Sequence, residues 1–251
     1  MNKSQIIAVA GTAGVGKTTW ITQQLSEAGA TSRYFCPHTG GTPIDQTRLA
    51  IDFPKLVVLA DEQVHQLQQL AINSTVYIEL GFHLSLATAN SLLAGLNVQK
   101  VAIVTPDTLE TEWHHWADTI EIGQSLSSAT PQDLWRSNLT SQILDPASLD
   151  MLWYEITNGA YGYVQRAKGI YDLADGRSFS FDFVAGQKSK YQELNLPLWL
   201  NGRPDRFSGM EIIGANLDRE AIGETLRDCC LSDEAIAYYQ EQTKQSMLEP
   251  A

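Results

Sequence analysis

The chain has 251 residues, of which 43% are hydrophobic and 18% are charged. This length and apolar content can bury a sizeable core in one large domain or two small ones, and we expect two. The 29 acidic side chains outnumber the 17 basic ones, so the net charge is −12 at pH 7. Because such a surface repels phosphate backbones and anionic lipids, the composition argues against nucleic acid and membranes as partners.

The first half of the chain alternates apolar runs with helical patterns. The stretch "TTWITQQLSEAG", closed by Gly29, and the stretch "DEQVHQLQQLAIN", closed near Asn73, are typical of helices. Continuous apolar runs predict buried parallel strands at residues 5–11, 55–61, 74–81 and 100–106. Alternation of this kind implies right-handed crossovers, so we expect an α/β fold with a parallel sheet covered by helices on both faces.

A glycine-rich motif joins the first predicted strand to the first predicted helix. It fits the phosphate-loop pattern G-x-x-x-x-G-K-[ST] at every fixed position and comprises Gly11, Thr12, Ala13, Gly14, Val15, Gly16, Lys17 and Thr18, with Thr19 following. The glycines let main-chain amides turn toward phosphate oxygens, Lys17 bridges the β and γ phosphates, and the Thr18 hydroxyl ligates magnesium. A chance match, or a loop that binds without hydrolysis, is the alternative. The motif is preceded by a predicted strand and followed by a predicted helix, and this context favours a working phosphate site.

The pattern changes after about residue 145. Asp218 and Ser232 are expected to cap two C-terminal helices. Four strands are expected, at residues 163–173, 177–185, 196–202 and 207–217, with a turn at 174–176 between the first two. The sequence therefore predicts a phosphate-loop nucleotide-binding domain at residues 1–145 and a small α+β domain at residues 146–251.

The second half resembles a known family in three segments. These are "RAKGIYDLADG" at residues 166–176, the "FDFVAG" that soon follows, and "FSGMEIIGANLDREAIGETLRDCCLSDE" from Phe207. They look like the C-terminal domain of the CobW-type proteins, which belong with HypB and UreG to a group of phosphate-loop GTPases and metallochaperones. The resemblance implies a P-loop NTPase sheet followed by a CobW C-terminal-like domain, with GTP and Mg²⁺ as ligands.

Two further segments supply candidate magnesium residues through this resemblance. Residues 41–49, "GTPIDQTRL", resemble the family's switch segment and put Asp45 at the position of its aspartate. Residues 76–81, "VYIELG", resemble the Walker B segment and put Glu79 at its acidic position. A carboxylate at a strand end beside the phosphate loop suits a hard divalent cation. The alternatives are an ordinary strand-end acid at Glu79 and a loop acid or helix N-cap at Asp45.

The sequence lacks the family's metal-binding residues. Pro37 and His38 stand where the family has an Asn-Glu pair, and residues 61–64, "DEQV", stand in place of a Cys-x-Cys-Cys motif. Cys36 and His38 alone do not complete a zinc site, so we expect none. The other two cysteines, Cys229 and Cys230, are expected to pack within the C-terminal domain. Because no Cys-x-x-Cys pair and no signal peptide are recognisable, we expect a cytoplasmic protein.

The sequence also departs from the family where guanine is read. Gly123, Gln124 and Leu126 stand where the family's Asn, Lys and Asp would be. The aspartate that accepts hydrogen bonds from guanine is missing, and a site without that carboxylate has little basis for rejecting adenine. We therefore expect weak discrimination between GTP and ATP.

Together these features predict a Mg²⁺-dependent purine nucleoside triphosphatase that is slow and GTPase-like. Lys17, Glu79 and Asp45 would be catalytic, and Thr18, Glu79 and Asp45 would serve the metal. The role would be regulatory, or accessory to cofactor or metal delivery, with an unidentified client protein. A different class of function is a non-catalytic pseudo-GTPase adaptor that binds a partner through its C-terminal domain. A small-molecule kinase is less favoured, because few arginines are available for a lid.

Overall fold

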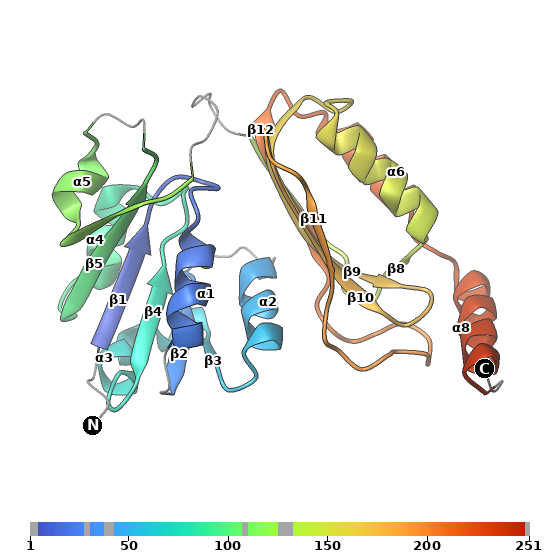
Figure 1. Ribbon diagram of the computed structural model, residues 1–251, viewed down its shortest axis with the longest axis horizontal. Helices are drawn as coiled ribbons and strands as arrows, with labels where there is room; N and C mark the ends of the chain where they lie inside the picture. The colour runs from blue at the N-terminus through green and yellow to red at the C-terminus, as the bar shows by residue number, and fades with distance from the viewer. Residues whose placement is uncertain (1–4, 28–30, 38–42, 107–109, 125–132, 249–251) are drawn as a thin grey trace. The chain divides into compact units, whose positions relative to one another are not determined.

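The computed structural model describes residues 5–27, 31–37, 43–106, 110–124 and 133–248. The chain divides into two compact units, Met1–Leu126 and Ser127–Ala251, and each has a sheet of its own (Figure 1). The division falls earlier in the chain than the boundary expected after residue 145. The reason is a strand, β7 (Asp133–Asn138), that pairs within the second sheet.

The sheet of the first unit has six strands in the order β3-β2-β4-β1-β5-β6, and all of its pairings are parallel. Its strands are β1 (Gln5–Ala10), β2 (Ser32–Phe35), β3 (Val57–Leu59), β4 (Thr75–Glu79), β5 (Val98–Val104) and β6 (Thr119–Ile122). The predicted parallel sheet is confirmed, and β1, β3, β4 and β5 overlap the predicted apolar runs.

Helices cover both faces of this sheet (Figure 1). On one face, α1 (Lys17–Glu27) and α2 (Ile44–Asp52) pack against β1 through a core that includes Ile7 and Val9. On the other face, the core includes Ile6 and Ala8 together with residues of α3 (Leu67–Leu70), α4 (Leu86–Leu93) and α5 (Glu112–Trp116). Neighbouring residues of β1 therefore enter different cores, which explains the unbroken apolar sequence of that strand.

The helical pattern predicted after residue 61 forms two short pieces. A 3₁₀ turn, η1 (Asp61–Gln66), leads into the single turn of α3. α3 ends at Leu70, three residues before the expected stop, with Ala71 as its C-cap. Asn73, in the turn that follows, has a φ of 58°, a left-handed conformation that asparagine tolerates.

The second unit is an antiparallel sheet in the order β11-β10-β9-β12-β7, with the short β8 pairing parallel to β9. Besides β7, its strands are β8 (Ile143–Leu144), β9 (Tyr163–Leu173), β10 (Ser178–Val184), β11 (Lys190–Glu193) and β12 (Gly209–Ala215). This architecture confirms the predicted α+β class.

The described residues of the second unit also form three helices. α6 (Pro146–Thr157) and α7 (Arg219–Asp228) pack on one face of the sheet through Trp153, Ile222 and Leu226. α8 (Asp233–Leu248) packs through Ile236 against Ile143. No helix within the described ranges combines the length and the apolar content needed to cross a bilayer.

The caps predicted for the last two helices are confirmed. Asp218 Oδ1 accepts a hydrogen bond from Ala221 N at 3.0 Å, and Ser232 Oγ accepts one from Ala235 N at 3.3 Å. The strand predicted at residues 196–202 is wrong. That segment is a loop, and Pro197 within it has no N–H to donate to a ladder.

A row of alternating charges crosses the second sheet. The row runs in register over five strands and consists of Arg136 (β7), Glu211 (β12), Lys168 (β9), Asp182 (β10) and Lys190 (β11). Arg136 Nε lies 2.7 Å from Glu211 Oε2, and Lys168 Nζ lies 3.0 Å from Glu211 Oε1. Because Met210 and Ile212 enter the core beneath α6 and α7, the row lies on the opposite face of the sheet.

Candidate functional site

The loop between β1 and α1 has a backbone that depends on its glycines. Gly11, Gly14 and Gly16 have φ values of +146°, +77° and +107°, which residues with side chains rarely adopt. A Cβ on Gly11 would lie 2.3 Å from Ile103 O on β5, so this position also has no room for a side chain. Trp20 N donates to Gly16 O at 2.9 Å, so α1 begins directly at the loop.

Lys17, the first residue of α1, is held by the loop that precedes it. Its side chain is buried, and Nζ donates to Gly11 O and to Thr12 O, each at 2.9 Å. A buried ammonium needs acceptors of this kind, because leaving it unpaired would cost several kcal/mol. The two bonds place the charge on the loop before any phosphate is bound.

Glu79 ends β4 beside the same loop. It is in register with Val9 of β1, the strand that leads into the loop. Thr18 Oγ1 donates to Glu79 Oε1 at 2.9 Å, and Tyr34 OH donates to Glu79 Oε2 at 2.8 Å. Glu79 and Tyr34 are both buried, and each carboxylate oxygen has a donor. The arrangement therefore compensates a buried negative charge and fixes its orientation.

Tyr34 is a site residue that no motif in the sequence indicates. Burial, and after it the charge of Glu79, raise the pKa of Tyr34 well above its usual value. The phenol therefore stays protonated and remains a donor to Glu79 at neutral pH. Tyr34 lies on β2, a strand too short and too polar to be predicted, and its hydroxyl carries no sequence signature that separates it from a core tyrosine.

Asp45 lies in the first turn of α2, where an acid suits the helix dipole. After burial and Glu79, the charges of Cys36 and Asp45 also raise the pKa of Tyr34. Asp45 is thus within electrostatic reach of the hydroxyl that holds Glu79. The structure brings Lys17, Thr18 and Glu79 to one loop and puts Asp45 on a neighbouring helix.

The donors at this loop fit Mg²⁺. Thr18 Oγ1 and Glu79 Oε1 are hard oxygen donors 2.9 Å apart, and Mg²⁺ takes one or two protein oxygens besides phosphates and waters. Among the described residues, a thiophilic ion has no comparable set of ligands. Within the described part of the chain, no three His, Cys, Asp or Glu side chains gather to hold a metal. Cys36 belongs to that part, whereas His38 lies outside it.

Purified protein is expected to retain no stoichiometric zinc, because the thiolates that would bind it tightly are missing from the sequence. Elemental analysis of protein prepared without chelators tests this expectation. One tightly held zinc per chain would contradict it. A Cys36→Ser protein analysed in parallel would then show whether Cys36, with His38 and His83, forms the site.

The segment that follows β6 packs against the phosphate loop. Gly123 N donates to Val104 O at 2.8 Å, and Gln124 N donates to Val15 O at 3.1 Å. A Cβ on Gly123 would lie 2.2 Å from Val15 O and 2.7 Å from Ile103 Cγ2. The asparagine of the family motif therefore has no room at this position. Leu126, the third departure from that motif, lies outside the described residues.

The two remaining cysteines belong to the hydrophobic core of the second unit. Cys229 is buried in it and Cys230 packs against it. Burial, followed by the neighbouring Cys230, raises the pKa of Cys229 to about 11, so its thiol is protonated and unreactive at neutral pH.

Part of the second unit is similar to a known domain family. Residues 140–230 match the family model of the cobalamin synthesis protein CobW C-terminal domain, which confirms the predicted resemblance over this region. Two crystal structures match at 13% identity, covering 91% of this chain and 99% of the other. They are Zn(II)-bound YjiA GTPase from E. coli, with a TM-score of 0.33, and a Zn(II)-bound triple mutant of YjiA GTPase, with a TM-score of 0.34. No curated protein matches the sequence.

Proposed function

We propose that this protein is a CobW-type phosphate-loop nucleoside triphosphatase that binds a purine nucleoside triphosphate with Mg²⁺ and hydrolyses it slowly. The observation that carries the proposal is the set of hydrogen bonds that orients Lys17, Thr18 and Glu79 at one loop. The CobW C-terminal domain supports GTP as the nucleotide and an accessory role in cofactor or metal delivery, with an unidentified client protein.

Lys17 and the loop amides bind the phosphates in this proposal. The amides of residues 11–19 and the positive end of α1 favour the β and γ phosphates. Lys17 Nζ exchanges its bonds to Gly11 O and Thr12 O for bonds to phosphate oxygens. The ammonium is then paired in both states, and it offsets charge that develops on the γ phosphate as water attacks.

Thr18, Glu79 and Asp45 serve the metal. Mg²⁺, when bound, supplies charge compensation for the phosphate oxygens. Thr18 Oγ1 would hold the ion directly, and Glu79 Oε1 would accept hydrogen bonds from water beside it. Tyr34 OH donates to Glu79 Oε2 and holds that carboxylate, so we assign Tyr34 as a positioning residue. Asp45, within electrostatic reach of Tyr34, would orient further water.

Glu79→Gln is expected to lower turnover by about tenfold or more and to change nucleotide affinity by less than about threefold. The lost negative charge acts mainly in the transition state, whereas the phosphate contacts remain. Phosphate release gives the turnover, and calorimetric titration gives the affinity. Tyr34→Phe, which removes a single hydroxyl, should move turnover in the same direction by a smaller factor. Equal losses of turnover and affinity in Glu79→Gln would contradict the assignment.

GTP and ATP are expected to bind within about tenfold of each other, or about 1.4 kcal/mol. The phosphate contacts do not involve the base, and residues 123–124 offer no carboxylate to guanine. Competition binding with both nucleotides measures the ratio. A preference for GTP above about a hundredfold would show that another acid reads guanine. Asp118 and Glu121 are the nearest candidates, although Asp118 Oδ2 already accepts from Lys100 N at 2.8 Å.

A non-catalytic adaptor is the second candidate function, and the pocket between β7 and α7 in the second unit favours it. Magnesium-dependent binding and turnover of GTP and ATP, measured in parallel on wild-type and Lys17→Ala protein, separate the two candidates. Turnover of the wild type above the Lys17→Ala background supports the enzyme. Turnover equal to that background supports the adaptor.

A further inference from the structure

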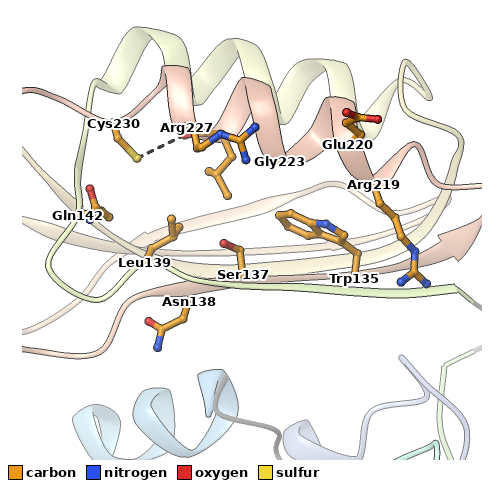
Figure 2. A pocket seen from close by; sticks show the side chains of 11 residues that line it. Trp135, Ser137, Asn138, Leu139, Gln142, Arg219, Glu220, Gly223, Arg227 and Cys230 are labelled. Atoms are coloured by element: carbon orange, nitrogen blue, oxygen red, sulfur yellow. Dashed lines mark hydrogen bonds between the residues drawn. The ribbon is translucent and has the colours of Figure 1, made fainter.

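A pocket of about 780 Å³ lies between the edge strand β7 and the helix α7 (Figure 2). This volume is within the range of concave ligand-binding sites. Trp135 and Ser137 of β7 line one side, and residues of α7 line the other. All of its lining residues belong to the second unit.

The helix side of the pocket is a stripe of α7 adjacent to the stripe that enters the core. Arg219, Gly223 and Arg227 follow each other at intervals of four residues and face the pocket (Figure 2). Gly223 lies in the helix interior, where glycine costs about 1 kcal/mol relative to alanine. Within 4 Å, a Cβ there would meet Arg227 Nη1 alone, at 3.5 Å. Packing does not require the glycine, and its effect is to keep the pocket wide.

The strand side of the pocket is an open edge. β7 stands at the end of its sheet, and β12 is its partner among the described strands. Leu139 N donates to Ser208 O at 2.9 Å, and the direction of such bonds alternates along an antiparallel strand. The main-chain groups of Leu134, Arg136 and Asn138 therefore point away from β12, and an edge of this kind can pair with an added strand.

We propose that β7 and α7 bind an extended, acidic segment of a partner protein by strand addition. The segment pairs with the outward main-chain groups of β7 and places alternate side chains in the pocket, over Trp135 and beside Gly223. Arg227 is exposed and forms no ion pair within the described ranges, so it can bind a carboxylate of the segment. Arg219, at the other end, already lies 3.6 Å from Asp133.

The basis for an acidic segment is this difference between the two arginines. At the end of the pocket near Arg219, Asp133 and Glu220 offset the positive charge. At the end near Arg227, the lining residues Asn138, Leu139 and Gln142 are neutral. A basic segment would meet the guanidinium of Arg227 at that end, whereas an acidic one would gain a charge-assisted hydrogen bond. The inference does not depend on nucleotide binding.

The first part of the test is a selection of random peptides of about nine residues, a common strand length, displayed on phage against immobilised full-length protein. Gly223→Leu protein serves for counter-selection. Leucine at this position extends into the pocket and has the better helix propensity, so the variant should be at least as stable as the wild type. Selected peptides are then synthesised, and their Kd is measured by fluorescence anisotropy.

We expect the selected peptides to alternate apolar residues with Asp or Glu, and to bind Gly223→Leu protein at least about tenfold more weakly, or about 1.4 kcal/mol. Glu224→Leu is the matched control, because it puts the same side chain on the exposed face of α7, outside the pocket. Its Kd should equal that of the wild type. Failure to enrich any peptide over the Gly223→Leu protein would overturn the proposal.

Asn138→Pro distinguishes two modes of binding. In strand addition the ligand forms hydrogen bonds with the main chain of β7, whereas a ligand that only fills the pocket does not. The substitution removes one outward N–H, and edge strands accept proline on that side. Asn138→Ala is its control, since it removes the same side chain, which accepts from Thr140 N at 2.8 Å, and keeps the N–H. Strand addition requires weaker binding to Asn138→Pro than to Asn138→Ala, and equal binding would contradict it.

Arg227→Glu tests the charge of the segment. Selection on this variant should yield peptides with Lys or Arg in place of Asp or Glu, because the rim then carries the opposite charge. An unchanged preference for acidic peptides would show that Arg227 does not read the segment. Thermal melting of each variant confirms that a loss of binding is not a loss of folding.

Discussion

Lys17→Ala protein is expected to bind nucleoside triphosphate at least about tenfold more weakly than the wild type, a loss of about 1.4 kcal/mol or more. The ammonium is a charge that the loop already holds in position, through Gly11 O and Thr12 O. In the variant the loop amides remain, but the ammonium that pairs with the β and γ phosphates is missing. Calorimetric titration with GTP in the presence of Mg²⁺ measures the change.

The control for this prediction must separate charge from folding. Removing the ammonium also removes the donor from two loop carbonyls, so the melting temperature of the variant has to be measured alongside its affinity. Lys55→Ala removes the same charge from an exposed position of the first unit and should bind as the wild type does. If Lys17→Ala binds as tightly as Lys55→Ala, the phosphate-loop proposal fails.

Gly123→Asn protein is expected to lose about 2 kcal/mol or more of folding stability and to bind both nucleotides more weakly. The substitution restores the first residue of the family's guanine motif, yet its Cβ would lie 2.2 Å from Val15 O. The obstacle is backbone, and relief would have to move Val15 between Gly14 and Gly16. Selectivity for GTP should therefore not improve.

Thermal melting and competition binding test this prediction together. Gln124→Ala is a suitable control, because position 124 is exposed and its contact with Val15 O uses the main chain. A Gly123→Asn protein that melts with the wild type and prefers GTP by more than about a hundredfold would contradict the prediction. It would show that the backbone of the phosphate loop can move to accommodate a side chain at position 123.

The predictable part of the fold is the part whose burial leaves a pattern in the sequence. β1 contributes side chains to two cores, so it is apolar throughout. An apolar run of this length, between polar residues and a glycine, indicates a buried strand. β2 and β7 were not predicted, because Arg33 and Arg136 interrupt them and their partners are distant in sequence. Tertiary pairing decides such strands, and local propensity does not.

The site residues also divide into those that the sequence predicts and those that only the structure reveals. Lys17 and Thr18 follow from a motif, since phosphate binding constrains consecutive residues. The prediction of Glu79 depended on the family resemblance, because an acidic residue at a strand end can have several roles. The Tyr34 contact with Glu79 joins two strands adjacent in the sheet whose residues are far apart in the chain. The pocket at Gly223 and Trp135 likewise depends on a helix and a strand meeting across the second unit.

The charge row of the second sheet makes other alignments of its strands unfavourable. A slip of one residue would turn a strand over and move its charges into the core. A slip of two would keep the face but set Glu211 opposite Leu134 or Asn138 on β7. Glu211 is buried, and a buried carboxylate without its partners costs several kcal/mol. Apolar side chains such as Ile212 and Ile213 can pack against more than one neighbour and so do not select a single register. The charge row does select one, because only the observed register pairs the charges on all five strands.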